Sequence, residues 1–226
     1  MTATVAPLSD LHHLRRWAIS LSRARVTAAL LAALVISTCL LRWGVSNPEA
    51  IERWASTNLV NLHHHPVGAL VTSAFISPGG APIDLAVLAL ACAVLELRVG
   101  ARRMLAVIAM GQVLASLITE GAVLMSILAG DESTQAAWQM DVGISYVLYT
   151  AVGAALLYVP RPWRRLAVGA AVVYVAVQLA ASWDMTAWGH AVSFAIGVCS
   201  WRLLRNGRAS RTEIGDDLRA ITEASA

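Results

Sequence analysis

Six long apolar runs occupy most of this chain of 226 residues, and they restrict it to one class of fold. The runs are separated by short clusters of arginine, acidic residues, proline and tryptophan rather than by polar domains. Inside a bilayer, a helix satisfies its own backbone hydrogen bonds and can be apolar on every side. We therefore predict an all-α, polytopic membrane protein with spans at residues 26–41, 81–97, 104–128, 142–160, 166–182 and 186–204.

The composition supports this class. Only 14% of the residues are charged, whereas soluble domains contain about 25%. The chain has no Gly-rich phosphate loop, dinucleotide fingerprint or Cys-x-x-Cys pair, so we predict no cofactor and no metal. The three cysteines lie inside apolar runs, which favours small buried side chains over a disulfide or a metal site. The arginines flank the spans, so nucleic-acid binding is not predicted.

The predicted membrane domain covers residues 26–205 and lies between two cytosolic segments, 1–25 and 206–226. Within it, residues 44–80 form a mixed segment whose apolar part is too short to cross, and we predict an interfacial loop. That loop contains three consecutive histidines, 63–65, which cannot all converge on one ion without straining the chain. A solvated or headgroup-facing role is therefore favoured over metal binding.

The distribution of arginine predicts the orientation of the spans. All 17 basic residues are arginine, and 15 of them fall in alternate segments: the N-terminal tail, residues 98–103, residues 161–165 and the chain from Arg202 onward. Only Arg42 and Arg53 fall on the other side. Because positively charged loops remain in the cytoplasm, both termini are predicted to be cytoplasmic.

Ionisable groups within spans are costly and are functional candidates by default. Asp84 and His190 lie three or four residues after the predicted starts of inward-running spans, and Ser145 does the same. At about 1.5 Å per residue, all three lie roughly 5–6 Å below the outer helix ends, in one layer. Histidine is the usual base for a serine nucleophile. Alternatively, Ser145 bonds its own helix and His190 simply pairs with Asp84.

Other residues surround this predicted layer. Glu120, in the outer half of the third span, is either a partner of the layer or lines a water-filled cleft. Gly143 lies beside Ser145, and Tyr149 is one turn below it, where its ring could stack on the imidazole. Small residues that allow close helix packing recur at every fourth position of the last span: Gly189, Ser193 and Gly197.

Taken together, these residues resemble the rhomboid family of intramembrane serine proteases over about residues 55–204. Residues 72–77 are similar to the family's segment before the second span, and Glu96-x-Arg98-x-Gly100 to the end of that span. Gly143-x-Ser145 matches the nucleophile motif, and Tyr149 occupies the position of a tyrosine that packs on the catalytic histidine. His190 and Gly197 match most of the motif of the sixth span, His-x-x-Gly-x-x-x-Gly.

The resemblance implies a six-transmembrane helical bundle in a bacterial plasma membrane. It implies Ser145 as nucleophile, His190 as general base and then acid, and Tyr149 as the residue that positions His190. The backbone N–H of Ser145 would help to hold the oxyanion. The implied partners are the lipid bilayer and a transmembrane protein substrate, whose span would enter laterally and unwind locally.

The sequence departs from the family pattern at four positions. Tyr146 follows the nucleophile where the family has glycine, and Ser193 replaces the middle glycine of the last motif. Gly80 and Asp84 replace a histidine and an asparagine that help to form the oxyanion hole. An ionised Asp84 would repel the oxyanion; a protonated Asp84 could donate a hydrogen bond, or Asp84 could orient His190.

Two alternatives to the protease remain open at the level of sequence. A relative without proteolytic activity would bind or guide membrane-protein clients through the same fold, and Gly80 and Asp84 favour this function. A small transporter could relay protons through Asp84, Glu120 and His190, but the spans show no repeat of the kind that transporters usually contain.

Overall fold

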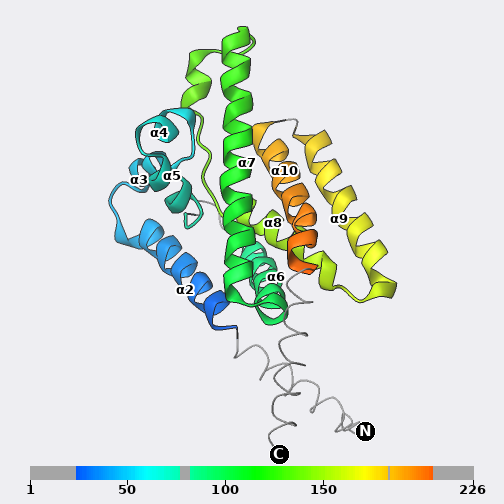
Figure 1. Ribbon diagram of the computed structural model, residues 1–226. Helices are drawn as coiled ribbons and strands as arrows, with labels where there is room; N and C mark the ends of the chain where they lie inside the picture. Colours follow the sequence, from blue (N-terminus) through cyan, green and yellow to red (C-terminus); the bar gives the residue numbers. More distant parts are fainter. Residues whose placement is uncertain (1–23, 77–81, 183, 206–226) are drawn as a thin grey trace, which may run out of the picture.

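The computed structural model describes residues 24–76, 82–182 and 184–205, and these residues contain helices but no strand. Six long helical segments correspond to the six predicted spans, so the prediction of an all-α membrane helical bundle is confirmed. Consecutive segments run in opposite directions along the bundle (Figure 1). They are α2 with the π-helical turn η1 (Arg25–Cys39 and Leu40–Gly44), α6 (Pro82–Val99), α7 (Ala101–Ala129), α8 with the 3-10 turn η3 (Ser145–Ala155 and Leu156–Tyr158), α9 (Arg161–Ala181) and α10 (Met185–Cys199).

The described helices differ in how well they match a single crossing of the bilayer. By length and composition, three of them are long and apolar enough to span: Arg25–Gly44, Ala101–Ala129 and Arg161–Ala181. Helix α6 contains 18 residues but includes Asp84, Glu96 and Arg98. Polar groups in a span usually face the interior of a bundle, which places α6 among the inner helices.

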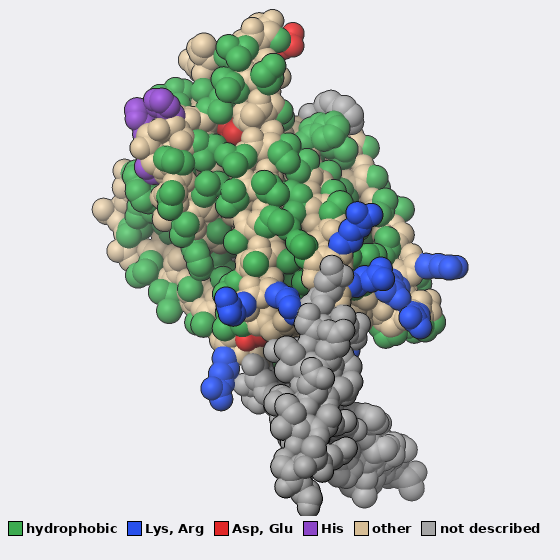
Figure 2. All heavy atoms as spheres, in the orientation of Figure 1, with side chains coloured by type: hydrophobic (Ala, Val, Ile, Leu, Met, Phe, Trp, Pro, Cys, Tyr) green, Lys and Arg blue, Asp and Glu red, His purple; other side chains and the backbone are tan. Residues whose placement is uncertain are grey.

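The core of the bundle consists of α6, α7, α8 and α10, and α8 packs against each of the other three. Helix α9 packs on α10 and η3 at the edge of the bundle (Figure 1). Its only buried residue is Val175, while Leu166, Val173 and Val177 are more than half exposed. The apolar surface visible in Figure 2 therefore requires an apolar environment, which the lipid bilayer provides.

The segment predicted as an interfacial loop is helical. It forms α3 (Pro48–Ala55), α4 (Leu59–His64) and α5 (Pro66–Ser73), with proline at the start of α3 and α5. Asn47 and Asn58 accept hydrogen bonds from backbone N–H groups of α3 and α4, as helix caps do. The sequence analysis did not resolve these helices, because each is shorter than the window that a periodicity analysis needs. The interfacial position of the segment stays a prediction.

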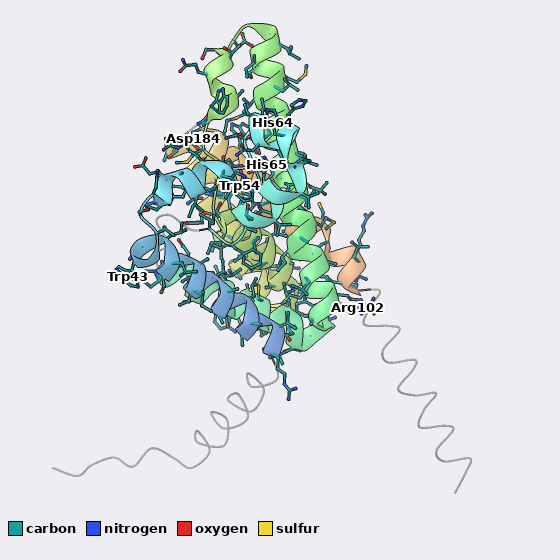
Figure 3. All side chains as sticks on the ribbon, turned by 90° about the vertical axis from the view of Figure 1, so that its left-hand side faces the viewer. Trp43, Trp54, His64, His65, Arg102 and Asp184 are labelled. Atoms are coloured by element: carbon teal, nitrogen blue, oxygen red, sulfur yellow. The ribbon has the colours of Figure 1, made fainter. Side chains whose placement is uncertain are left out.

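One of the three consecutive histidines contributes to this segment's structure. The His65 ring stacks on Trp54 with a centroid distance of 5.0 Å, and its Nε2 lies 2.9 Å from the Trp54 carbonyl oxygen (Figure 3). These contacts connect α3 to the start of α5. Among the described residues, no three potential metal ligands gather at one point.

Helix α8 is shorter than its neighbours. Its 11 α-helical residues and three 3-10 residues rise roughly 22 Å, whereas the hydrocarbon core of a bilayer is about 30 Å thick. Each end of this segment borders a cavity: Gly143, Ile144 and Ser145 at one end, and Leu157, Tyr158 and Val159 at the other. The short central helix thus leaves space toward both surfaces of the bundle.

The Glu96 side chain anchors α2 to the core. Its carboxylate accepts hydrogen bonds from Val26 N–H at 3.0 Å, Thr27 N–H at 2.7 Å and Thr27 Oγ1 at 2.7 Å. The first N–H groups of a helix have no acceptor within the helix, and its N-terminus attracts negative charge. A buried carboxylate from α6 satisfies both requirements, and it thereby fixes the first span against the second.

We predict that Glu96→Ala lowers the free energy of unfolding by about 3 kcal/mol, because buried donors lose a charged acceptor. Thermal unfolding of the purified protein in detergent measures this change. Glu132→Ala removes an exposed acid instead and should change stability by less than about 0.5 kcal/mol. Equal stability of the two variants would contradict the anchoring role.

Candidate active site

A cavity of about 660 Å³ opens between α6, α8, α9 and α10. It borders the N-terminal parts of α6, α8 and α10, away from the arginines at and beyond the C-terminal ends of α6 and α10. Its walls are mostly apolar, with polar side chains from all four helices. Five residues singled out in the sequence line it: Asp84, Gly143, Ser145, Tyr149 and His190. Residues from separate spans are therefore brought to one site, although their chemical roles stay predictions.

Ser145 is the first residue of α8. The predicted span began at residue 142, but the helix cannot extend back through Gly143, whose φ of +142° is rarely adopted by residues other than glycine. Ser145 therefore lies at the helix N-terminus rather than one turn inside it. The backbone N–H groups of the first turn have no acceptor within the helix and form a potential anion site.

The segment that leads into α8 is held by the short helices. The Asp141 carbonyl oxygen accepts a hydrogen bond from Thr57 N–H at 2.9 Å, and Asp141 N–H donates to Ser56 Oγ at 2.9 Å. Gly143 N–H donates to the Ser73 carbonyl oxygen at 3.2 Å. These bonds connect the α3–α4 corner and the end of α5 to the residues just before Ser145. The α3–α5 segment thus positions the candidate nucleophile.

The His190 ring is held face to face with Tyr149, with ring centroids 4.2 Å apart and an interplanar angle of 12°. The Tyr149 hydroxyl donates a hydrogen bond to Gln178 Oε1 on α9, and Gln178 Nε2 donates to the Tyr174 hydroxyl at 3.1 Å. The orientation of the imidazole is therefore connected through Tyr149 to α9. His190 Nε2 is buried and has no hydrogen-bond partner among the described residues.

In the described part of the chain, Ser145 Oγ and the His190 ring form no hydrogen bond with each other, although both groups line the same cavity. Catalytic hydrogen bonds are often long in unliganded enzymes and shorten when substrate binds. A base nitrogen without a partner remains able to accept a proton. His190 is therefore available as the base for Ser145, provided that the two groups come within hydrogen-bonding distance when substrate binds.

Helices α8 and α10 pack closely because glycines occupy their contact positions. A Cβ at Gly197 would overlap the Thr150 carbonyl oxygen, and a Cβ at Gly189 would overlap the Tyr146 ring. Between them lies Ser193, which is fully buried and whose carbonyl oxygen accepts a hydrogen bond from Thr150 Oγ1 at 3.0 Å. This close contact determines the spacing between the helices that carry Ser145 and His190.

Tyr146, which follows the candidate nucleophile, connects the site to a pair of acids. Its ring lies edge-on to His190 at a centroid distance of 6.2 Å, and its hydroxyl interacts with the Asp141 carboxylate. Burial raises the pKa of Asp141, and contacts with the hydroxyls of Thr57 and Tyr146 partly offset this effect. Glu120 shares a small cavity with Asp141 and Tyr146.

The structure places Asp84 and Glu120, which the sequence analysis assigned to the same polar layer, in two different cavities. Asp84 lines the main cavity, but within the described chain it forms no hydrogen bond with the His190 ring. Glu120 is buried in the small cavity and is not among the residues that line the main one. Gly80 lies outside the described residues.

Two contributors to the site were missed by the sequence analysis. Gln178 is a polar side chain within the apolar run of the fifth span, and a polar residue in a span is a functional candidate that the sequence analysis could have noted. Asp141 immediately precedes the fourth predicted span, and its carboxylate accepts a hydrogen bond from Thr57 Oγ1 at 3.0 Å. Because Thr57 lies far away in the sequence, no local pattern indicated this contact.

We predict that Gly189→Ala destabilises the protein by about 1–3 kcal/mol, because the added methyl group overlaps the Tyr146 ring. Gly169→Ala on α9 is the matched control, since its Cβ would meet no atom within 4 Å. Alanine there should be neutral or stabilising by up to about 1 kcal/mol. Melting temperatures in detergent compare the two, and a smaller loss for Gly189→Ala would contradict the packing argument.

Comparison with known families gives one match. A family model described as "Rhomboid-like protein" matches residues 20–210, which include all six helical segments and every residue of the main cavity. No curated protein and no solved structure matches the chain.

Proposed function

The chain belongs to the rhomboid-like protein family, and from this premise we propose that it is an intramembrane serine protease with a Ser145–His190 dyad. One observation carries the proposal: Ser145 and His190, on adjacent helices, line one cavity, with Tyr149 stacked on the imidazole. The nucleophile lies at a helix N-terminus, where backbone N–H groups can stabilise negative charge.

The proposed reaction is acyl transfer. As Ser145 Oγ bonds to the carbonyl carbon of the substrate, its proton passes to His190 Nε2, the unpartnered nitrogen. The resulting oxyanion is stabilised by the N–H of Ser145 and the first turn of α8. His190 then gives the proton to the leaving amine as the C–N bond of the substrate breaks, which leaves an acyl ester on Ser145. A water molecule attacks this ester while His190 takes its proton, and His190 returns the proton to Ser145 Oγ as the ester C–O bond breaks.

The substrate class follows from the position of the cavity. Its walls include Ile83 and Val87 of α6 and Ala171 and Val175 of α9, and α9 is the least buried of the long helices. A substrate span can therefore enter laterally from the bilayer between α6 and α9. With the arginine-rich end in the cytoplasm of a bacterial cell, cleavage occurs near the outer surface of the plasma membrane.

A second candidate function is the binding of membrane-protein clients without cleavage. Two observations favour it: Asp84 places a carboxyl group in the cavity, and Ser145 and His190 form no hydrogen bond in the described chain. A carboxylate near the developing oxyanion opposes the charge that the reaction creates, and loss of one oxyanion donor costs about 100–1000-fold in rate. The same cavity would then hold a client span without cutting it.

We predict that a fluorophosphonate probe labels the purified protein in detergent and that Ser145→Ala abolishes labelling. His190→Ala should reduce the labelling rate by about 100-fold or more, because the general base is lost. Ser182→Ala, at the exposed serine that follows the C-terminal end of α9, should label normally. Labelling that survives Ser145→Ala, or no labelling of any form, would favour the client-binding function.

We predict that Asp84→Asn raises the labelling rate by about tenfold or more, because an amide removes the negative charge and adds a hydrogen-bond donor to the cavity in which the oxyanion would form. Asp84→Ala removes the charge without adding a donor and should give a smaller increase. The rate of fluorophosphonate labelling measures both. If both substitutions lower the rate, Asp84 instead orients His190 as the third member of a Ser-His-Asp set.

A further inference from the structure

The second large cavity of the protein lies at the opposite end of the bundle and has a volume of about 900 Å³. Five arginines line it: Arg98, Arg161, Arg164, Arg202 and Arg205. They come from the end of α6, the start of α9 and the chain that follows α10, so three segments far apart in sequence converge. Figure 2 shows arginine side chains gathered at this end of the molecule.

The positive charges of this cavity are not balanced by the described residues. No acidic side chain lines the cavity, and none of its five arginines forms an ion pair with a described acid. Arg164 is half-buried and donates one hydrogen bond, to the Leu157 carbonyl oxygen at 3.3 Å, while the other four arginines are exposed. Like charges that converge on one space repel each other, and an anion in that space removes the repulsion.

The rest of the lining is apolar and aromatic. Leu157, Val159 and Val198 contribute aliphatic surface, and Trp201 is fixed by a hydrogen bond from Nε1 to the Gly153 carbonyl oxygen at 2.9 Å. Tryptophan is common at the level of lipid headgroups. A ligand that matches this lining carries a phosphate for the guanidinium groups and an apolar portion beside it.

We propose that this cavity binds the headgroup of an anionic phospholipid, with the phosphate held by the arginines and the glycerol and upper acyl chains against the apolar wall. Basic pockets between helices at the cytoplasmic surface are suited to such lipids. The charge bias of membrane loops requires arginines on this side of the bilayer, but it does not require them to line one cavity. A free phosphate ion would satisfy the arginines and leave the apolar wall unused.

The test is lipid binding to the full chain in detergent, measured by native mass spectrometry with phosphatidylglycerol and with phosphatidylcholine. The wild type is expected to bind phosphatidylglycerol more tightly by about tenfold or more. Arg98→Gln/Arg202→Gln should weaken phosphatidylglycerol binding by about 30-fold. Arg98→Lys/Arg202→Lys keeps the charge and should retain most of the binding.

The matched control is Arg102→Gln/Arg165→Gln, which removes two exposed arginines from the same end of the bundle but outside the cavity. It should change binding by less than about twofold, because charges beyond the cavity act only through screened, long-range attraction. If the double variant of the cavity does not fold, the single variants Arg98→Gln and Arg202→Gln replace it. Each should bind phosphatidylglycerol about fivefold more weakly than the wild type.

Three results would overturn the proposal. If the control variant loses as much phosphatidylglycerol binding as the cavity variant, the lipid is attracted to the basic surface in general and not bound at a site. Equal affinity for phosphatidylcholine would show that no anionic headgroup is selected. Displacement of the lipid by millimolar inorganic phosphate would show that the cavity binds the free ion.

Discussion

The close packing of α8 against α7 and α10 is the constraint on which the rest of the structure depends. At Gly111 on α7, Gly197 on α10 and Gly153 on α8, a Cβ would overlap atoms of the neighbouring helix. Small residues let backbones approach where no water is present to drive helices together. Because α8 is enclosed in this way, the residue at its N-terminus has a fixed position relative to the facing residue of α10.

Because α8 is short, it leaves a cavity at each end of the bundle, and the residues that line the two cavities differ in chemistry. One end leaves a cavity with a hydroxyl, an imidazole and free backbone N–H groups, and the other leaves a cavity surrounded by guanidinium groups. The three short helices α3–α5 stabilise the first end, because their hydrogen bonds hold the chain just before Ser145. A segment with no candidate catalytic residue therefore determines the geometry of the candidate nucleophile.

The departures from the family pattern have different physical consequences. Tyr146 replaces a glycine, and Gly189 on the facing helix leaves space for its ring, so the bulk of Tyr146 is accommodated. Its hydroxyl joins a buried polar group with Asp141 and Glu120 beside the site. Asp84 has no comparable compensation among the described residues, because its carboxyl group lines the cavity where negative charge would develop. Asp84 is therefore the position that most separates the two candidate functions.

The sequence by itself determined the number and alternating direction of the six long helical segments, because hydropathy and arginine placement depend only on local composition and the bilayer. It did not indicate the short helices α3–α5. Ser145 and His190, which the sequence analysis placed in one layer, line one cavity, but Ser145 begins its helix instead of lying one turn inside it. Only the tertiary structure decided where α8 begins, since that depends on the φ of Gly143, and which polar residues join the site, since Gln178 and Asp141 acquire their partners from other helices. Likewise, arginines counted loop by loop predict an orientation, but their convergence on one cavity results from packing between segments far apart in the chain.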